Sequence, residues 1–306
     1  MAYNNVAIAG ASGNIGTAIT KALIDSKQFN VTILSRSGSA AKPSIHGDAS
    51  TVEVDYTNHD NLTAALKGQD AVISVLSHAG LAHQRALLDA SVSAGVHRFI
   101  PSEFGSDSLN PKAATLPIFA PKKEQEKYLR QLAAEGKISW TIVISGPALD
   151  FCMRMRFLGP DLKKRKITWL DDGVGKFSTS ILATIGQAVV GVLKKPEETN
   201  NRAVYVQSTA LTLRDMFRLS KLSLGEEGWT EVDGGKTEEN ERLSYEKLGN
   251  GQKDMGVMLV FLQSAIFGEG YGGNFQKLDN DLLGIEELKE SDIIELMKKI
   301  DRELSL

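Results

Sequence analysis

The sequence predicts an α/β fold in which a doubly wound parallel sheet is followed by a smaller, mixed and mainly helical region. In the first half, short apolar runs alternate with helical segments, which is typical of parallel strands joined by right-handed crossovers. After residue 150 this alternation loosens and helical patterns predominate. We therefore divide the 306-residue chain into a first unit, residues 1–150, and a second region, residues 151–306.

The chain begins with an apolar run, Val6 to Ala9, which passes through a glycine-rich loop directly into a helical pattern. Gly10 permits a sharp turn off the strand, Gly13 leaves room for a pyrophosphate, and Gly16 lets the helix lie close to the sheet. The helix then points its free N–H groups and positive dipole end at the phosphates. Glycine triplets also occur in tight strand-to-helix turns. We predict a dinucleotide site of the Rossmann type, with cofactor contacts from Gly10, Ser12, Gly13, Asn14, Ile15 and Gly16.

The second strand, Val31 to Leu34, ends in Ser35 and Arg36. In a dinucleotide fold the residue at this point meets the adenosine ribose, where an acid favours a 2′-hydroxyl and a base favours a 2′-phosphate. No acid occurs from Asn30 to Lys42, so the sequence favours NADP(H), with Arg36 as the main phosphate ligand. Such a contact is worth on the order of 1.5–3 kcal/mol. A solvated loop cation is the alternative for Arg36, and the weaker phosphate candidates are Ser35, Ser37 and Lys42.

Four further apolar runs complete the predicted sheet: Val52 to Val54, Ala71 to Val75, Arg98 to Ile100 and Trp140 to Ile144. Because the carboxyl ends of parallel strands meet at one edge, the loops that follow them line one cleft. Ser77 and His78 follow the fourth strand and are expected near the pyrophosphate and the nicotinamide ribose. Ser102 follows the fifth strand and can hydrogen-bond a substrate oxygen. A loop histidine and a turn hydroxyl explain His78 and Ser102 equally well.

The second region begins with an apolar, methionine-bearing segment where a substrate wall is expected. Phe151 and Met153 are its candidates for substrate contact, although core packing explains them equally well. The polar run from Gly225 to Lys253 is interpreted as mobile surface or a lid. The other elements predicted here are strands at Ile167 to Leu170 and Ala203 to Gln207, and helices at Ile181 to Leu193, Leu213 to Leu222, Gly256 to Phe267 and Ile293 to Ile300.

Composition narrows the class of protein. A net charge of −3 does not indicate binding to nucleic acid or to an acidic membrane surface, both of which favour an excess of positive charge. The single cysteine, Cys152, excludes an internal disulfide and a multi-cysteine metal site, and makes the cytoplasm the natural compartment. His78 and His83 are five residues apart, which does not suit a metal site. We expect a small-molecule substrate, no metal, no nucleic-acid or membrane partner, and a monomer or homodimer.

The segment VHRFIPSEFG at 96–105, together with GASGNIG at 10–16, resembles the NmrA-like and isoflavone-reductase-like branch of the atypical short-chain dehydrogenases. The resemblance covers most of the chain and is weakest between Leu224 and Asp254. It implies that Phe104 packs near the cofactor ring and that a lysine on the next helix stands beside the nicotinamide and takes part in proton transfer. The family pattern places two apolar residues six and seven positions after that lysine. Lys122 satisfies it, with Tyr128 and Leu129.

Helical phase gives an independent argument for Lys122. It lies on the face of Leu129, which should pack on the sheet, whereas Lys123 points outward. A lysine in a partly dry cleft has its charged form disfavoured and becomes a usable acid–base group near neutral pH. Pro121 can delay or kink the helix start, and a solvated helix lysine is the structural alternative for Lys122. The tyrosine mechanism of short-chain reductases is not expected, because none of the six tyrosines has a lysine four residues later.

The sequence therefore predicts a cytosolic, NADPH-dependent reductase. Hydride would pass to a C=C, C=N or C=O group of a small aromatic or secondary-metabolite substrate, with Lys122 donating or relaying the proton. Two other classes stay open. One is an NADP(H)-sensing regulator of the NmrA type, which binds the dinucleotide without turnover and contacts a partner protein. The other is a non-redox enzyme, such as an isomerase, that retains the dinucleotide.

Overall fold

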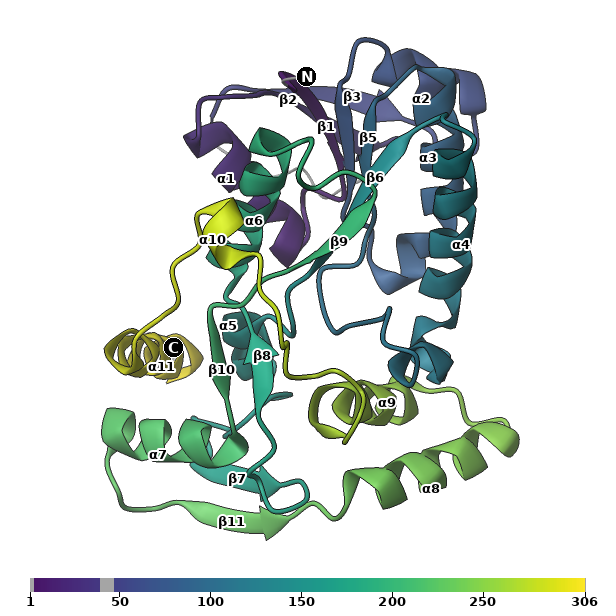
Figure 1. Ribbon diagram of the computed structural model, residues 1–306. Helices are drawn as coiled ribbons and strands as arrows, with labels where there is room; N and C mark the ends of the chain where they lie inside the picture. Colours follow the sequence, from purple (N-terminus) through teal and green to yellow (C-terminus); the bar gives the residue numbers. More distant parts are fainter. Residues whose placement is uncertain (1–2, 39–46, 306) are drawn as a thin grey trace.

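The computed structural model describes residues 3–38 and 47–305, and it contains a seven-stranded, fully parallel sheet (Figure 1). The strand order is β3-β2-β1-β4-β5-β6-β9, which confirms the predicted doubly wound α/β class. The six predicted strands all form. In chain order, the seven strands are β1 (Asn5–Ala9), β2 (Asn30–Arg36), β3 (Ala49–Val54), β4 (Ala71–Ser74), β5 (Arg98–Ile100), β6 (Ser139–Ile144) and β9 (Arg202–Tyr205).

Helices cover both faces of the sheet, and alternate residues of β1 face opposite layers. Val6 and Ile8 pack toward α1 (Asn14–Asp25) and α6 (Leu182–Lys194). Ala7 and Ala9 pack toward the opposite layer. This division follows because successive residues of a strand point to opposite faces of the sheet. The small side chains of Ala7 and Ala9 let the helices on their side pack closely. The helices of the opposite layer are α2 (His59–Leu66), α3 (Gln84–Ser93) and α4 (Ala120–Ala134).

The sheet is not complete at its sixth strand, contrary to the sequence prediction. β9 pairs in parallel with β6, although more than fifty residues separate the two strands. Its helix α6 crosses α1 so closely that a Cβ on Gly186 would lie 2.7 Å from the Ala18 carbonyl oxygen. Nucleotide-sheet residues therefore come from both sides of position 150, and the division of the chain at that position stays a prediction.

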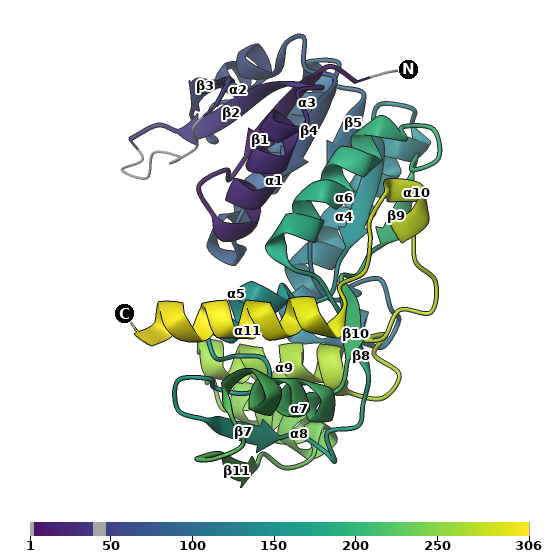
Figure 2. The same cartoon turned by 90° about the vertical axis from the view of Figure 1, so that its left-hand side faces the viewer.

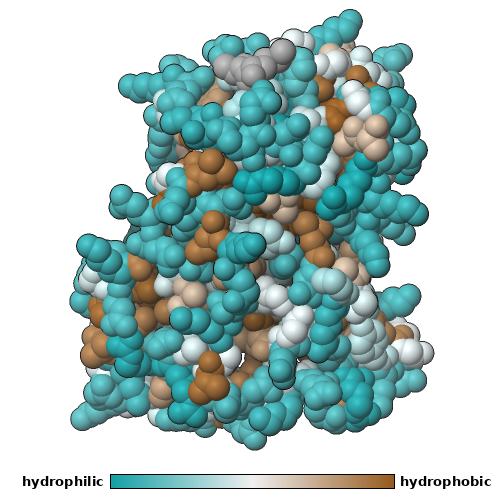
Figure 3. Space-filling view, in the orientation of Figure 1, coloured by the Kyte–Doolittle hydropathy of each residue, from teal (hydrophilic) through white to brown (hydrophobic). Residues whose placement is uncertain are grey.

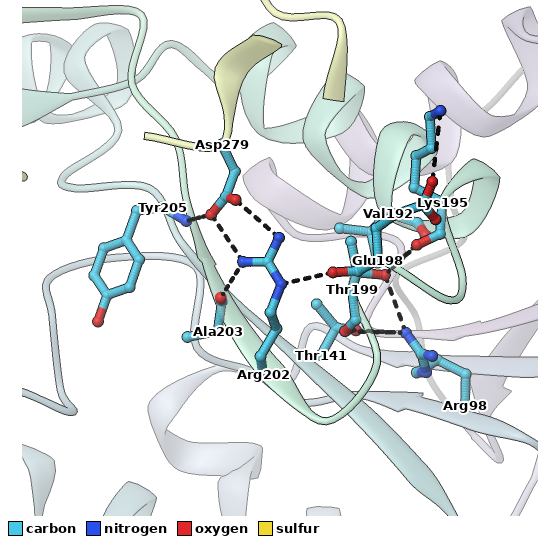
Figure 4. A network of polar contacts seen from close by, with 10 residues as sticks. All are labelled: Arg98, Thr141, Val192, Lys195, Glu198, Thr199, Arg202, Ala203, Tyr205 and Asp279. Atoms are coloured by element: carbon cyan, nitrogen blue, oxygen red, sulfur yellow. Dashed lines mark hydrogen bonds and ion pairs between the residues drawn. The ribbon is translucent and has the colours of Figure 1, made fainter. Parts of the chain in front are cut away.

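A buried arginine joins the turn before β9 to the sheet (Figure 4). Arg98 on β5 is 1% exposed, and its Nη1 donates to Thr141 Oγ1 at 2.6 Å and to Thr199 Oγ1 at 3.2 Å. Its Nη2 donates to the Pro196 carbonyl oxygen at 2.8 Å. On the other side of β9, Arg202 Nη2 donates to Asp279 Oδ1 at 2.8 Å. These contacts anchor the start of the last strand of the sheet on two sides.

The second region is mixed and mainly helical, as predicted. Figure 2 shows α11 (Glu290–Ser305) running between the sheet and the lower helices, where Ile293 and Met297 join a hydrophobic cluster. In the space-filling view, most of the visible surface is polar and apolar residues gather near the middle of the molecule (Figure 3). The other elements are α5 (Leu149–Arg154), α7 (Leu213–Leu224), α8 (Thr237–Gly249), α9 (Met255–Phe267), α10 (Asn280–Leu283), the antiparallel pair β8 (Phe177–Thr179) and β10 (Thr209–Leu211), and the parallel pair β7 (Lys166–Trp169) and β11 (Thr230–Asp233).

The segment from Gly225 to Lys253, which was interpreted as mobile surface or a lid, has regular secondary structure; its mobility stays a prediction. This segment forms β11 and the whole of α8. The sequence of α8 shows no apolar stripe, because few of its side chains are buried. On its exposed face, Arg242 forms ion pairs with Glu239 and Glu246. Short 3₁₀ turns also occur at His78–His83, Ala113–Thr115 and Pro117–Phe119. Within the described ranges, no helix has the length and apolarity needed to cross a membrane.

Candidate functional site

The loop between β1 and α1 holds three glycines in different circumstances. Gly10 has φ +86°, and a Cβ there would lie 2.3 Å from the Val75 carbonyl oxygen. A Cβ on Gly16 would lie 2.1 Å from the Gly10 carbonyl oxygen. The fold itself therefore requires glycine at positions 10 and 16, as predicted from the turn and from helix packing.

Gly13 is different because neither backbone strain nor packing demands it. Its φ of −76° and ψ of 166° suit any residue, and the nearest atom to an added Cβ is the Gly10 carbonyl oxygen at an ordinary 3.6 Å. Ser12, Gly13 and Asn14 are exposed at the start of α1, and no side chain caps this helix. The loop therefore fits a phosphate group that approaches the backbone, because the protein leaves this position open.

We expect Gly13→Ala to separate ligand binding from folding. The free energy of unfolding should stay equal or rise by about 0.4–1 kcal/mol, because alanine fits this backbone and restricts the unfolded chain. The Kd for NADPH should rise about tenfold or more, because the methyl group occupies the space through which the phosphate approaches the backbone. Titration calorimetry and urea unfolding measure the two effects. Gly16→Ala is the contrast, because its steric conflict is with the protein and should lower stability. Unchanged NADPH affinity in Gly13→Ala would remove the phosphate role.

The glycine loop and the end of β2 line one cleft of about 290 Å³. Of the predicted cofactor residues, the structure brings together Gly10, Ser12, Gly13, Ser35, Arg36 and Ser77 in its wall. Gly16 lies beneath the loop, Ile15 packs partly into the core, and Asn14 lies at the exposed start of α1. Lys42 and the side chain of His78 lie outside the described part of the chain. The described residues that line the cleft include no acid.

An aromatic pair lies in this cleft, and sequence reasoning missed one of its two members. The rings of Tyr56 and His83 lie 5.3 Å apart between centroids, with an interplanar angle of 35°. Burial raises the pKa of Tyr56 to about 12, and the nearby charge of Arg36 opposes this shift. Tyr56 stands just after β3, and the rule for carboxyl ends of strands predicts its place in the cleft. Nothing in the sequence marks His83, which reaches the cleft through a 3₁₀ turn.

Lys122 lies on the inward face of α4, as helical phase predicted. Its side chain is 22% exposed, whereas Lys123 and Lys127 are exposed. Pro121 neither delays nor kinks the helix, because α4 starts at Ala120 and a proline is tolerated in a first helical turn. Figure 1 shows α4 beginning at the carboxyl edge of the sheet, beside α9.

A buried carboxylate meets Lys122 in this position. Lys122 Nζ lies 3.2 Å from Glu103 Oε2 and donates to the Glu103 carbonyl oxygen at 3.1 Å. Glu103 is 4% exposed, and Ser108 Oγ donates to its Oε2 at 2.7 Å. Lys122 is therefore partly buried, as expected, but it faces an anion that sequence reasoning did not foresee. Its acid–base role stays a prediction. Glu103 was within the PSEFG segment, but its pairing depends on the loop conformation.

The remaining predicted site residues are held by the protein's own contacts. Ser102 Oγ donates to the Leu76 carbonyl oxygen at 2.7 Å, and its N–H donates to Gln84 Oε1 at 2.8 Å. Phe104 is buried in the core cluster beside the sheet, and Phe151 packs partly against that cluster. Met153 is fully buried in the lower cluster, so core packing accounts for it. The roles of Ser102, Phe151 and Met153 as substrate contacts stay predictions.

Other reactive groups do not form a second centre in the described residues. Burial raises the pKa of Cys152 to about 12, so its thiol is a poor nucleophile at neutral pH. Across residues 3–38 and 47–305, no group of three or more histidine, cysteine, aspartate or glutamate side chains is placed to hold a metal ion.

Comparison with known proteins gives the relationship of the chain. It is 34% identical to oxidoreductase aprR of Aspergillus flavus over 298 residues, covering 96% of this chain and 98% of that protein. It is 31% identical to oxidoreductase poxI of Penicillium oxalicum over 295 residues, covering 94% and 91%. The solved structure described as AtPrR2 with NADP+ and (+)pinoresinol shares the fold, with a TM-score of 0.74, 22% identity and coverage of 98% of this chain and 99% of that chain. The profile of the NmrA-like family matches residues 3–228, and the chain belongs to this family.

Proposed function

We propose that this protein is an NADPH-dependent reductase that transfers hydride to a C=C, C=N or C=O group of a small aromatic or secondary-metabolite substrate. Its relatives aprR and poxI are named oxidoreductases, and AtPrR2, which shares its fold, binds NADP+ and pinoresinol. The cleft beside the glycine loop supplies the matching site. The proposed compartment is the cytoplasm, and the proposed state is a monomer or homodimer.

The observation that carries this proposal is the position of Arg36 in the same cleft as Gly13. An arginine at the end of the second strand suits a 2′-phosphate, whereas the acid typical of NAD(H) sites is lacking among the described lining residues. Gly10, Ser12 and Gly13, with the start of α1, would hold the pyrophosphate, and Ser35 and Ser77 would contact the sugar and phosphate groups. When bound, NADPH supplies a hydride.

Lys122 supplies the proton in this proposal. Its ammonium carries a proton that a reduced substrate needs, and the neighbouring Glu103 fixes where that group stands. The lower helices, with α9 beside the start of α4 (Figure 1), would enclose the substrate, which favours hydride transfer by excluding water. Phe104 stays the proposed neighbour of the cofactor ring.

The direct test follows NADPH absorbance with the purified protein and a panel of enones, imines and aromatic carbonyls. We expect oxidation with at least one substrate class and a preference for NADPH over NADH. Tight NADPH binding without oxidation of any panel member, together with capture of a partner from cell extract, would favour the sensing regulator instead. Turnover of a substrate with no net change in cofactor redox state would favour an isomerase.

We expect Arg36→Ala to weaken NADPH binding about 10- to 100-fold, because one charge-assisted contact is worth about 1.5–3 kcal/mol. The Kd for NADH should change less than about threefold, because NADH has no 2′-phosphate. Titration calorimetry with both cofactors measures the difference. Lys67→Ala, which removes an exposed cation at the end of α2 outside the cleft, is the matched control. Equal losses for NADPH and NADH would contradict the assigned role.

A further inference from the structure

The pair formed by Glu103 and Lys122 joins two elements that are nineteen positions apart in sequence. Glu103 lies in the loop after β5, and Lys122 lies in the first turn of α4. Lys122 receives two contacts from this one residue, one from the carboxylate and one from the carbonyl oxygen. Two acceptors on a short loop fix the lysine nitrogen more firmly than a single surface ion pair would.

The carboxylate is itself held in place. Glu103 is 4% exposed, and the hydroxyl of Ser108 in the same loop donates to the oxygen that also faces Lys122. A buried anion is costly unless it is paired and hydrogen-bonded, and both conditions are met here. Ser108 therefore holds the Glu103 carboxylate, and Glu103 in turn holds the Lys122 nitrogen.

No other charged group on the neighbouring elements replaces this partner in the contacts of the described residues. Each of these groups has contacts of its own. Lys112 donates to the Glu269 carbonyl oxygen, Arg85 and Asp89 on α3 contact Tyr128, and Asp107, in the loop of Glu103, accepts from Leu109 N–H and Tyr205 O–H. On α4 itself, Glu126 pairs with Arg130.

From this arrangement we infer that Glu103 is a positioning residue for Lys122: its carboxylate and its carbonyl oxygen hold the amine at the carboxyl edge of the sheet before a substrate arrives. This inference rests on the proposed function for the role of Lys122 in turnover. The accessibility of the Lys122 amine in the protein without cofactor can be measured whether or not the protein is a reductase. Two readouts therefore separate the inference from the function.

The first readout is the reactivity of the Lys122 amine in the protein without cofactor. Acetic anhydride acylates only the free base, and fragment-ion mass spectrometry distinguishes Lys122 from its neighbour Lys123. In Glu103→Gln, acylation of Lys122 relative to Lys123 should rise several-fold at neutral pH, because the neutral amide no longer holds the amine against the loop and the nitrogen becomes more accessible to the reagent. Glu124→Gln, the same change at an exposed position of α4, should leave the ratio unchanged.

The second readout uses any substrate that the NADPH panel identifies. Glu103→Gln should lower kcat about tenfold or more and leave the KM for NADPH within about threefold, because the lysine and not the cofactor cleft is disturbed. Glu103→Asp keeps the charge with a shorter reach, so it should recover part of the loss and also serves if the glutamine variant folds poorly.

An unchanged acylation ratio in Glu103→Gln overturns the inference whatever the protein catalyses. A raised ratio with no turnover in the wild-type protein supports the positioning of Lys122 and counts against the proposed function alone. A raised ratio with unaltered kcat shows that the pair is structural and overturns its role in turnover.

Discussion

Lys122→Met is expected to lower kcat by a factor of about 100 or more on any substrate that the wild-type protein reduces. A positioned general acid contributes about 100- to 10,000-fold, and methionine has a similar length but carries no proton. The Kd for NADPH should stay within about threefold, because Arg36 and the glycine loop lie in a cleft whose lining does not include Lys122. Steady-state kinetics and calorimetry on the same preparation measure both values.

The control for this variant is Lys123→Met, which removes an exposed lysine from the same turn of α4. It should retain wild-type kcat. Lys122→Met also leaves the buried carboxylate of Glu103 without its cation, so we expect the free energy of unfolding to fall by about 1–3 kcal/mol. Assays are therefore run well below the unfolding temperature of the variant. Wild-type turnover by folded Lys122→Met would remove this residue from the chemistry.

Arg98→Met should lower the free energy of unfolding by about 3 kcal/mol. The guanidinium is buried, and burial lowers the pKa of Arg98, with the charge of Glu197 among the effects that oppose the shift. Methionine fills much of the space, but it leaves the acceptors at Thr141, Thr199 and Pro196 without their donor. Urea unfolding followed by far-ultraviolet circular dichroism gives the difference.

Arg302→Met is the matched comparison, because it removes an exposed arginine from the end of α11. Its effect should stay within about 0.5 kcal/mol, as for most surface changes. A loss below about 1 kcal/mol in Arg98→Met would show that other contacts hold the turn before β9.

Much of the fold was predictable because its signals are local. The glycine loop, six apolar strands and the inward face of α4 each follow from spacing within one segment. The seventh strand was recognised as a strand at Ala203 to Gln207, but its place beside β6 was not. Strand position in a sheet depends on long-range pairing, and in β9 the deciding contacts come from Arg98 and Asp279, which are far away in sequence.

The candidate site was likewise predictable where its signals are local, and not where it depends on how distant segments meet. Arg36 follows from a rule that links a position after the second strand to a chemical group, and the structure places it in the cleft wall. The partner of Lys122 did not follow, because the pairing of Glu103 arises from a loop that folds back between β5 and α4. His83 is likewise visible only in three dimensions. α8 was missed because its exposed ion pairs produce no apolar stripe.

The late arrival of β9 and α6 has a consequence for synthesis on the ribosome. When the first 150 residues have been translated, β6 still has an open edge, and the apolar face that Ile185 and Val189 later cover is exposed to water. Open strand edges and uncovered apolar faces invite association between nascent chains and engagement by chaperones. The nucleotide-binding half therefore cannot finish folding co-translationally until the polypeptide has emerged past Tyr205.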